Sequence, residues 1–379
     1  MKMYCKVITI LLFCVMTFQV GAQKYKTVLP YRMVGGKMIV DLVMNGTSRS
    51  FIFDTGGRTA LTGEICEELG LAVVDSLVVT DVNSKKAAYP LVLIESLMTP
   101  DQKINFKHVS AMKLAKPSPF ACFHTDGLIG SDLLVRTIVE IDGKNKTITI
   151  TSAENPSTVS LRKMLPFTKS GMPIILLQAG AGNNITALFD TGCPSFFSLK
   201  VSDYEILKTT GAFQVLSEGY GEGSIGVAGM AEADISHRVC LPVLSVGGTK
   251  FQNVTSETST PPFTLLGVKL LDYGKVTLDY PRARFYFEAN EAANDLSSKH
   301  YNVALRVKDG ELIISTVWSA MKGVVEVGDK VTRINGKPVR MYDFCESIIN
   351  GIPELKEKKK TRLTVQTEQG EKVIVYQKE

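Results

Sequence analysis

Apolar and polar residues alternate over much of the chain, with the period of two that is typical of β-strands. Residues 146–150 show this most plainly. Strands are also expected at 38–44 and 174–177, each followed by a glycine-containing turn and a second strand that runs into an aspartate. A short helix is expected just after Thr62, whose hydroxyl can cap its N-terminus. The pattern therefore predicts a mainly β chain with little helix.

One part of this pattern occurs twice. Phe-Ile-Phe-Asp-Thr-Gly at 51–56 returns as Ala-Leu-Phe-Asp-Thr-Gly at 187–192. An apolar-apolar-Gly element follows each copy, at 128–130 and at 265–267. An Asp-Thr-Gly triplet is expected only about 0.1 times by chance in a chain of this length. Two triplets at matched places therefore indicate a duplicated unit.

The duplicated motif resembles the catalytic motif of the retropepsin-like and pepsin-like aspartic proteases. The resemblance covers residues 30–288 and implies a bilobal acid-protease β-barrel fold with pseudo-twofold duplication. Lobe 1 is expected at 23–155 and lobe 2 at 160–288. In this family each lobe donates one aspartate, so the resemblance assigns catalysis to Asp54 and Asp190. It implies polypeptide substrates, with no cofactor and no metal.

Two carboxyl groups suit this chemistry because carboxylates held about 3 Å apart cannot both ionise cheaply, so one pKa rises and the other falls. The ionised group can take a proton from water while the protonated group donates to the scissile carbonyl. The resemblance also assigns roles within the two loops. It assigns inter-lobe hydrogen bonds to Thr55 and Thr191, and tight turns to Gly56 and Gly192.

The residues that follow the two triplets depart from the family pattern. Gly57 and Cys193 stand where Ser, Thr or Ala is common. A hydroxyl there can hydrogen-bond the carboxylate and lower its pKa, whereas Gly57 has no such group and a thiol is a weak donor. We therefore expect a pH optimum less acidic than that of a pepsin-like digestive enzyme.

β-hairpins that close over a peptide and exclude water are also required by the family fold. They are expected at 78–93 in lobe 1 and at 218–230 in lobe 2, with Tyr89 and Tyr220 as candidate substrate contacts. Residues 221–226 match a dinucleotide-binding fingerprint by letter, but neither a core strand nor a helix flanks them. A glycine-rich hairpin is the better interpretation.

The last part of the chain resembles a bacterial PDZ domain, a small α+β unit expected at 300–379 after a polar linker at 288–298. The resemblance rests on Gly-Asp-Lys-Val-Thr-Arg-Ile-Asn-Gly-Lys-Pro-Val at 328–339 and on a helix expected at 341–349. It implies a groove that binds an extended peptide as an added strand. It assigns the edge of that groove to Leu312, Ile313 and Ile314.

Two functions are compatible with these motifs. The first is an aspartic endopeptidase whose PDZ domain binds substrate or partner peptides. The alternative is a catalytically inactive peptide-binding protein that retains the protease fold and acts as a PDZ adaptor. The intact triplets favour the enzyme, while Gly57 and Cys193 leave the alternative open.

Residues 1–22 have the features of a secretory signal peptide. Lys2 and Lys6 precede an apolar run at 8–20, and small residues precede an expected cleavage after Ala22. The run is shorter than the roughly 20 residues that a membrane span needs. We therefore expect a periplasmic or secreted protein with no membrane span after signal removal.

The net charge of the chain limits the class of partner that it can bind. The chain has 43 basic and 38 acidic residues, and 41 basic residues remain without the signal, so its net charge of +3 argues against nucleic-acid binding. We expect a monomer.

Two of the seven cysteines leave with the signal. The other five, none of them in a C-x-x-C pair, allow at most two disulfides of unknown pairing. These five are Cys66, Cys122, Cys193, Cys240 and Cys345.

Overall fold

The computed structural model describes residues 24–378, except for 82, 153–159, 169–170, 181, 224, 227–228, 231, 261 and 357–359. The expected signal peptide at 1–22 lies outside the described residues. The described chain is mainly β, which confirms the fold class expected from the alternating pattern. Among its helices, none is both long enough and apolar enough to cross a membrane.

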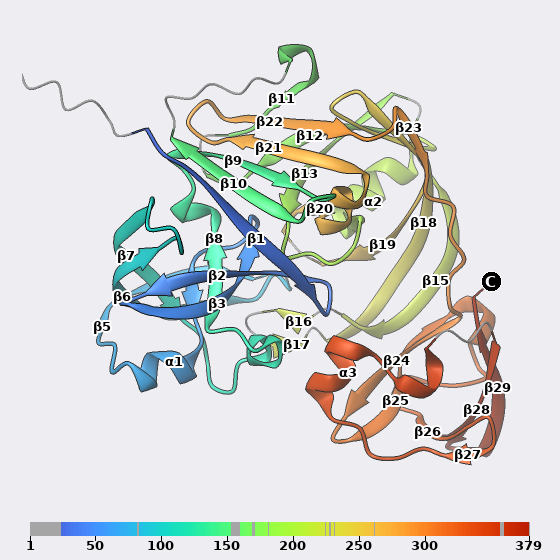
Figure 1. Ribbon diagram of the computed structural model, residues 1–379. Coiled ribbons are helices and arrows are strands. Elements are labelled where there is room, and N and C mark those ends of the chain that lie inside the picture. Colours follow the sequence, from blue (N-terminus) through green and yellow to red (C-terminus); the bar gives the residue numbers. More distant parts are fainter. Residues whose placement is uncertain are drawn as a thin grey trace, which may run out of the picture.

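Lobe 1 is a set of antiparallel hairpins in which two strands pair in parallel at the first Asp-Thr-Gly (Figure 1). β3 pairs with β8 so that Asp54 lies opposite Gly130. Thr62 caps α1 as predicted, because its hydroxyl accepts a hydrogen bond from the Ile65 amide. The elements are β1 (Lys26–Val34), β2 (Lys37–Met44), β3 (Thr47–Asp54), β4 (Ala60–Leu61), α1 (Gly63–Glu68), β5 (Val73–Thr80), β6 (Lys86–Met98), β7 (Asn105–Lys113), η1 (Pro119–Phe123), β8 (Gly127–Gly130), η2 (Ser131–Leu133), β9 (Thr137–Asp142) and β10 (Thr147–Ser152).

Lobe 2 repeats this arrangement. β13 pairs in parallel with β20, and Asp190 lies opposite Gly267. The elements are η3 (Leu161–Lys163), β11 (Met164–Pro166), β12 (Ile174–Ala179), β13 (Asn183–Asp190), β14 (Phe197–Lys200), α2 (Val201–Lys208), β15 (Gln214–Glu222), β16 (Ile225–Gly226), β17 (Gly229–Met230), β18 (Ala233–Val246), β19 (Thr249–Ser259), β20 (Thr264–Gly267), η4 (Val268–Tyr273), β21 (Gly274–Asp279) and β22 (Arg284–Ala289).

The two lobes share a sheet and an apolar core. β9 of lobe 1 pairs antiparallel with β21 of lobe 2, which makes the sheet continuous between the lobes. One cluster of buried side chains extends through both lobes and includes Phe53 and Phe189, the residues that precede the two aspartates. Phe189 meets Phe285 edge to face, with 5.5 Å between ring centroids. Fully burying one such ring contributes roughly 2–3 kcal/mol, so the two Asp-Thr-Gly loops begin at a packed core.

The C-terminal unit has its own apolar cluster. Its helix begins later than the expected residue 341, because Asp343 caps it and Tyr342 is buried in the cluster. The elements are β24 (Val303–Lys308), β25 (Glu311–Trp318), η5 (Ser319–Met321), β26 (Lys330–Ile334), β27 (Lys337–Pro338), α3 (Phe344–Asn350), η6 (Pro353–Leu355), β28 (Lys360–Thr367) and β29 (Gly370–Gln377).

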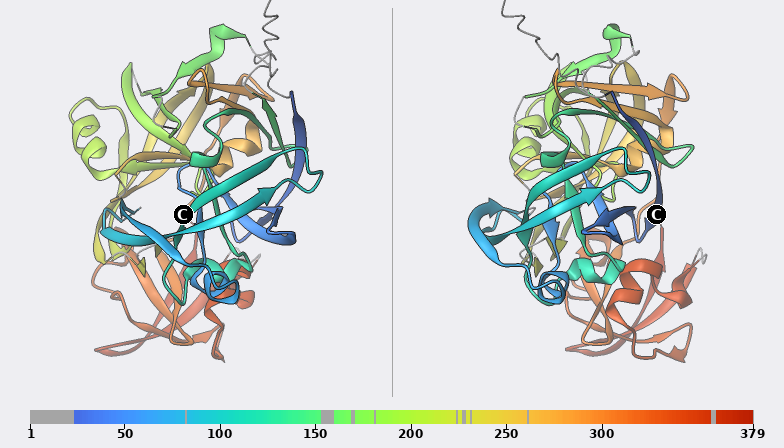
Figure 2. Two further views of the ribbon diagram at one scale, coloured as in Figure 1. Left: turned by 90° about the vertical axis from the view of Figure 1, so that its left-hand side faces the viewer. Right: turned by 60° about the vertical axis from the view of Figure 1, so that its left-hand side comes forward.

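This unit is attached to both lobes, whereas the sequence predicted a module behind a linker (Figures 1 and 2). The expected linker contains β23 (Ala293–Asp295), which pairs in parallel with β19. β25 pairs with β15 of lobe 2. A disulfide joins Cys122 of lobe 1 to Cys345 of α3. These contacts link residues far apart in sequence, so local composition did not reveal them.

Candidate active site

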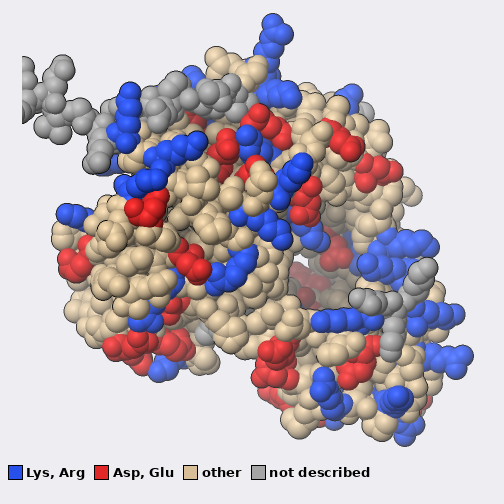
Figure 3. All heavy atoms as spheres, viewed as in Figure 1, with Lys and Arg blue, Asp and Glu red and all other residues tan. Residues whose placement is uncertain are grey.

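Asp54 and Asp190 end equivalent buried strands and line one cleft of about 1610 Å³. Figure 3 shows the molecule hollowed between the two-lobed body and the C-terminal unit, with charged side chains at the edge of the hollow. Each aspartate is oriented by its own loop, since its Oδ1 accepts a hydrogen bond from the glycine amide two residues later. The distances are 3.0 Å from Gly56 N to Asp54 and 2.8 Å from Gly192 N to Asp190.

Thr55 and Thr191 join the two loops through four buried hydrogen bonds. The Thr55 amide donates to the Thr191 hydroxyl at 3.0 Å, and the Thr191 amide donates to the Thr55 hydroxyl at 3.1 Å. Each hydroxyl then donates to the opposite lobe at 2.7 Å, from Thr55 to Phe189 O and from Thr191 to Phe53 O. Every donor and acceptor in this set is paired. The loops are therefore held in register with each other across the pseudo-twofold axis.

The glycines let each carboxyl group approach the opposite loop. A Cβ on Gly56 would lie 2.5 Å from Asp190 Cγ, and a Cβ on Gly192 would lie 2.6 Å from Asp54 Oδ2. Neither distance is possible between non-bonded atoms, so any side chain here would displace the opposite aspartate. The absence of a Cβ, rather than a left-handed backbone, is the requirement at both positions.

The surroundings of the pair favour one shared proton. Burial raises the pKa of Asp190, and the negative charge of Asp54 and a hydrogen bond with its carboxyl raise it further. The ammonium of Lys37 and the Gly192 amide act in the opposite direction and lower that pKa. Two carboxyl groups that interact this strongly titrate as a unit. Such a unit can hold one acidic and one basic oxygen at the same pH.

Gly57 and Cys193 leave the outer carboxylate oxygens without a hydroxyl partner from these positions. A Cβ on Gly57 would lie 2.8 Å from Asp54 Oδ2, so that a serine there needs local rearrangement. The Cys193 thiol instead lies 3.1 Å from the Ser195 hydroxyl. Burial and the charge of Asp190 raise the pKa of Cys193, which keeps it protonated and makes it a poor nucleophile.

The lobe 1 hairpin, β5 with β6, covers one side of the cleft. Its first strand and its tip line the cleft, and at the tip the Ser84 hydroxyl donates to Thr260 O of lobe 2 at 2.6 Å. Tyr89 is on the other strand and is only 7% exposed within a core cluster. It does not line the cleft, so the structure contradicts its expected substrate contact. The sequence could not reveal which strand of the hairpin faces inward.

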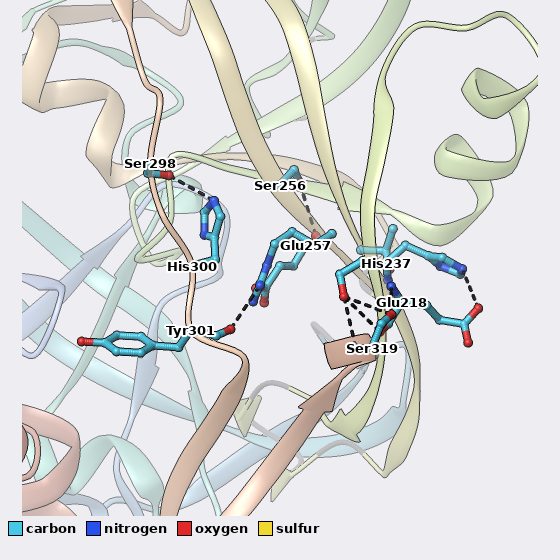
Figure 4. A network of polar contacts seen from close by, with 11 residues as sticks. Glu218, His237, Ser256, Glu257, Ser298, His300, Tyr301 and Ser319 are labelled. Atoms are coloured by element: carbon cyan, nitrogen blue, oxygen red, sulfur yellow. Dashed lines mark hydrogen bonds and ion pairs between the residues drawn. The ribbon is translucent and has the colours of Figure 1, made fainter. Parts of the chain in front are cut away.

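The lobe 2 hairpin, β15 with β18, reaches the cleft with its glycines. Gly221 and Glu222 line the cleft, whereas Tyr220 is 52% exposed and does not line it. The expected substrate contact at Tyr220 therefore has no support from the residues that line the cleft. The same hairpin holds the C-terminal unit: Figure 4 shows Ser319 beside Glu218, whose carbonyl accepts from the Ser319 hydroxyl at 2.8 Å.

The C-terminal unit has a groove of about 400 Å³ between β24 and α3. Leu312, Ile313 and Ile314 do not form its edge, because they lie on the inner strand β25, which pairs with β24 on one side and with β26 on the other. Within the described part of the chain, β24 pairs only with β25, so its other edge is the one beside the helix. Leu305 and Arg306 of β24 line both this groove and the main cleft.

Two features near the site were not predicted from the sequence. Lys37 lies in the cleft with both aspartates, at a position where the two copies of the repeat carry different residues. Asp132 accepts hydrogen bonds from the amide and hydroxyl of Thr59 at 2.9 and 2.8 Å, which joins η2 to the segment that follows the first Asp-Thr-Gly. Over the ranges that the structure describes, no cluster of three His, Cys, Asp or Glu side chains is arranged to hold a metal ion.

Comparisons with known proteins give matches among solved structures alone. No protein-family model matches the chain, and no curated protein matches it. The chain is similar to the aspartic proteinase from Irpex lacteus with a TM-score of 0.42 and 10% identity, covering 71% of this chain and 98% of that one. It is also similar to a retropepsin-like aspartic protease from Rickettsia conorii with a TM-score of 0.25 and 18% identity, covering 34% and 92%. At these identities the similarity concerns the fold alone.

Proposed function

We propose that this chain is an aspartic-type endopeptidase that hydrolyses peptide bonds in polypeptides with a water activated by Asp54 and Asp190. The observation that carries the proposal is the pair of loops, in which each lobe's glycine lies directly against the other lobe's carboxyl group. The hydrogen bonds of Thr55 and Thr191 fix this arrangement before any substrate binds. Such preorganisation is what catalysis by a fixed acid and base requires.

In the proposed reaction the pair begins with one proton. The ionised carboxyl group takes a proton from a water bound between Asp54 and Asp190, and the resulting nucleophile attacks the scissile carbonyl carbon. The protonated carboxyl group donates to the carbonyl oxygen as the tetrahedral intermediate forms. The intermediate then collapses: the carboxyl group that took the proton from water donates it to the nitrogen, the other carboxylate takes a proton back from a hydroxyl group of the intermediate, and the C–N bond breaks. Burial that raises the pKa of Asp190 keeps the required proton on the pair at mildly acidic pH.

The cleft supports a polypeptide substrate. Its volume of about 1610 Å³ exceeds the roughly 300–1,000 Å³ of small-molecule sites. The hairpins of both lobes reach it and can exclude water from a bound chain. An extended peptide lying between them would pass over the aspartate pair.

The direct test is cleavage of a denatured protein mixture by wild type, Asp54→Asn and Asp190→Asn between about pH 2 and 8. Wild type should cleave, and each variant should lose more than about 100-fold in kcat/KM because an amide cannot hold or release the shared proton. Asp41→Asn, on an exposed ion pair with Arg32, is the matched control. Wild type that binds peptides without cutting them at any pH would favour the inactive peptide-binding alternative. A fastest rate at about pH 2 would refute the expected optimum.

We propose further that the C-terminal unit is a PDZ-type domain that binds an extended peptide between β24 and α3. The groove there and the unpaired edge of β24 support this assignment. Phe344→Lys, in the groove, should abolish binding of peptides captured by wild type, with exposed Lys107→Met as control. Equal binding by both variants would refute the groove.

Export to the periplasm or beyond is also part of the proposal. The apolar segment at 8–20 supports it, and so does the disulfide Cys122–Cys345, since disulfides persist in oxidising compartments. Fractionation of cells that express the full chain should recover it outside the cytoplasm without residues 1–22. Recovery of the uncleaved chain in the cytoplasm would refute export.

A further inference from the structure

Lys37 places a cation beside the second catalytic loop. It is the first residue of β2 in lobe 1, and it lines the cleft together with Asp54 and Asp190. Its ammonium group donates a hydrogen bond to the carbonyl oxygen of Gly192 in lobe 2. The amide of the same Gly192 donates to Asp190. One glycine therefore connects Lys37 to the orientation of a catalytic carboxyl group.

The internal repeat makes this cation an asymmetric feature. The shift that superposes Asp54 on Asp190 and Gly35 on Gly171 pairs Lys37 with Pro173. Pro173 has no charge, and its carbonyl oxygen accepts the Phe189 amide at 3.0 Å. The two loops share their threonine hydrogen bonds and glycine contacts, yet a lysine of this kind serves only one of them. The duplication alone does not explain it.

The turn that carries Lys37 is held on three sides. Gly35 and Gly36 both have positive φ, at 54° and 79°, and they join β1 to β2. A Cβ on Gly35 would lie 2.9 Å from Phe123 of η1 and 3.2 Å from the Ile349 backbone of α3. A Cβ on Gly36 would lie 3.0 Å from Pro194, which follows the second catalytic loop. Lobe 1, lobe 2 and the C-terminal unit therefore all fix the position of this turn.

We propose that Lys37 is a positioning residue for the reaction proposed above: its ammonium group favours the negative charge that the aspartate pair must carry to activate water. A nearby cation stabilises a carboxylate and so opposes the effect of burial. In agreement with this, Lys37 lowers the pKa of Asp190 while burial and Asp54 raise it. The inference rests on the proposed function, but its electrostatic part can be measured without turnover.

Other titratable groups also face the pair or line the cleft around it. Arg58 pairs with Asp132 at 3.9 Å, so these two charges offset each other. Burial raises the pKa of the Tyr280 hydroxyl, and the charges of Asp132 and Asp54 raise it further, so this group stays neutral. The remaining titratable groups that line the cleft are Asp81, Cys193, Glu222, Glu232, Asp234, Glu257, Lys269, Tyr273, Asp295, His300 and Arg306. Lys37 donates a hydrogen bond from its charged group directly to the loop of Asp190.

The first test is the pH dependence of kcat/KM for wild type, Lys37→Met and Lys37→Arg. Without the cation, both limbs of the profile should move to higher pH by about one unit, and arginine should restore the wild-type limbs. Exposed Lys107→Met changes net charge equally and should leave the limbs unmoved. Overlapping profiles for Lys37→Met and wild type would overturn the proposal, as would a change in KM with unmoved limbs.

The second test separates this inference from the proposed activity. Carbon-13 NMR of labelled aspartate carboxyl groups follows the titration of the pair even in an inactive protein, with Asp54→Asn and Asp190→Asn providing assignments. Lys37→Met should raise the midpoints of the pair by about one unit. Unmoved midpoints would overturn the role of Lys37 whether or not the protein cleaves peptides. Moved midpoints in a protein that cleaves nothing would uphold it while refuting the endopeptidase.

Discussion

Cys122 and Cys345 form a disulfide that closes 223 residues of sequence and joins η1 of lobe 1 to α3 of the C-terminal unit. Around it, Ile348 and Ile349 pack against the lobe 1 cluster that contains Phe123. The cross-link therefore lies within an apolar contact and does not bridge two otherwise separate surfaces. It holds the helix of the C-terminal groove close to the turn that carries Lys37.

Removing this bond should destabilise the protein. We expect Cys122→Ala/Cys345→Ala to lose about 2–4 kcal/mol in the free energy of unfolding, because the cross-link restricts the unfolded chain over a long loop. In a denaturant titration monitored by hydrogen exchange, the C-terminal unit should then unfold at a lower denaturant concentration than the lobes. Cys240→Ala removes a free thiol and is the control. Unfolding of the double variant at the wild-type denaturant concentration would contradict the role of this bond.

The inter-lobe hydrogen bonds of Thr55 should matter for stability as well as for geometry. Thr55→Val keeps the shape but removes one donor and one acceptor, which leaves the Thr191 amide and the Phe189 carbonyl unpaired. Each unpaired buried group costs about 1–3 kcal/mol. Thermal unfolding should therefore show a large loss for Thr55→Val and a small one for Thr55→Ser, which retains the hydroxyl. Equal losses in the two variants would mean that packing, and not hydrogen bonding, holds the loops.

The parts of the fold that sequence could predict are those with local causes. The strands leading to Asp54 and Asp190 follow from their apolar runs, and the start of α1 follows from the Thr62 cap. The direction in which a side chain points within a hairpin has no such local cause, because it depends on which surface the hairpin covers. Tyr89 is therefore buried and Tyr220 exposed, although neither neighbouring sequence distinguishes them.

Pairings between residues far apart in the chain could not be predicted from the sequence for a similar reason. Five cysteines permit several pairings, and only the folded chain brings Cys122 to Cys345. The segment 288–298 has the composition of a linker, yet β19 offers an edge on which β23 pairs. Lys37 carried a signal in the repeat, where the matching residue is proline. A difference between two copies of a repeat becomes informative once the shared site is located.

The raised pKa of Asp190 also has a consequence for stability. Ionising this buried group costs more free energy in the folded protein than in the unfolded chain, where an aspartate has a pKa of about 3.9. Its contribution to stability is therefore full below about pH 4 and is lost as pH rises through the folded pKa. Asp190→Asn should accordingly have a higher melting temperature than wild type near pH 7. This gap between the two melting temperatures should shrink towards pH 4.

Melting temperatures at a series of pH values measure this gap. Asp41→Asn, in an exposed ion pair, should show little gap at any pH. A gap for Asp190→Asn that is absent at pH 7, or that widens towards pH 4, would contradict the raised pKa of Asp190. A stabilised but inactive Asp190→Asn would instead indicate that the protein gives up stability for its proposed chemistry.

Arg306 connects the C-terminal unit to the lobe 2 hairpin at the cleft. Its guanidinium group lies 2.5 Å from the Glu222 carboxylate and donates to Gly223 O at 3.1 Å. Both charged side chains are about four-fifths buried, with exposures of 20% and 21%. Removing one member of such a pair leaves the other charge unpaired away from water. We therefore expect Arg306→Leu to loosen the end of β15.

Hydrogen–deuterium exchange is the measurement for this expectation. The amides of residues 219–222 should exchange at least about tenfold faster in Arg306→Leu, since a loss of about 1.4 kcal/mol in local stability is a tenfold change. KM for polypeptide cleavage should rise with it, because the hairpin lines the cleft. Arg333→Leu breaks an exposed pair with Glu371 at 4.0 Å and should change neither quantity. Faster exchange confined to β24 would mean that Arg306 stabilises its own strand and not the hairpin, which would refute this link between groove and cleft.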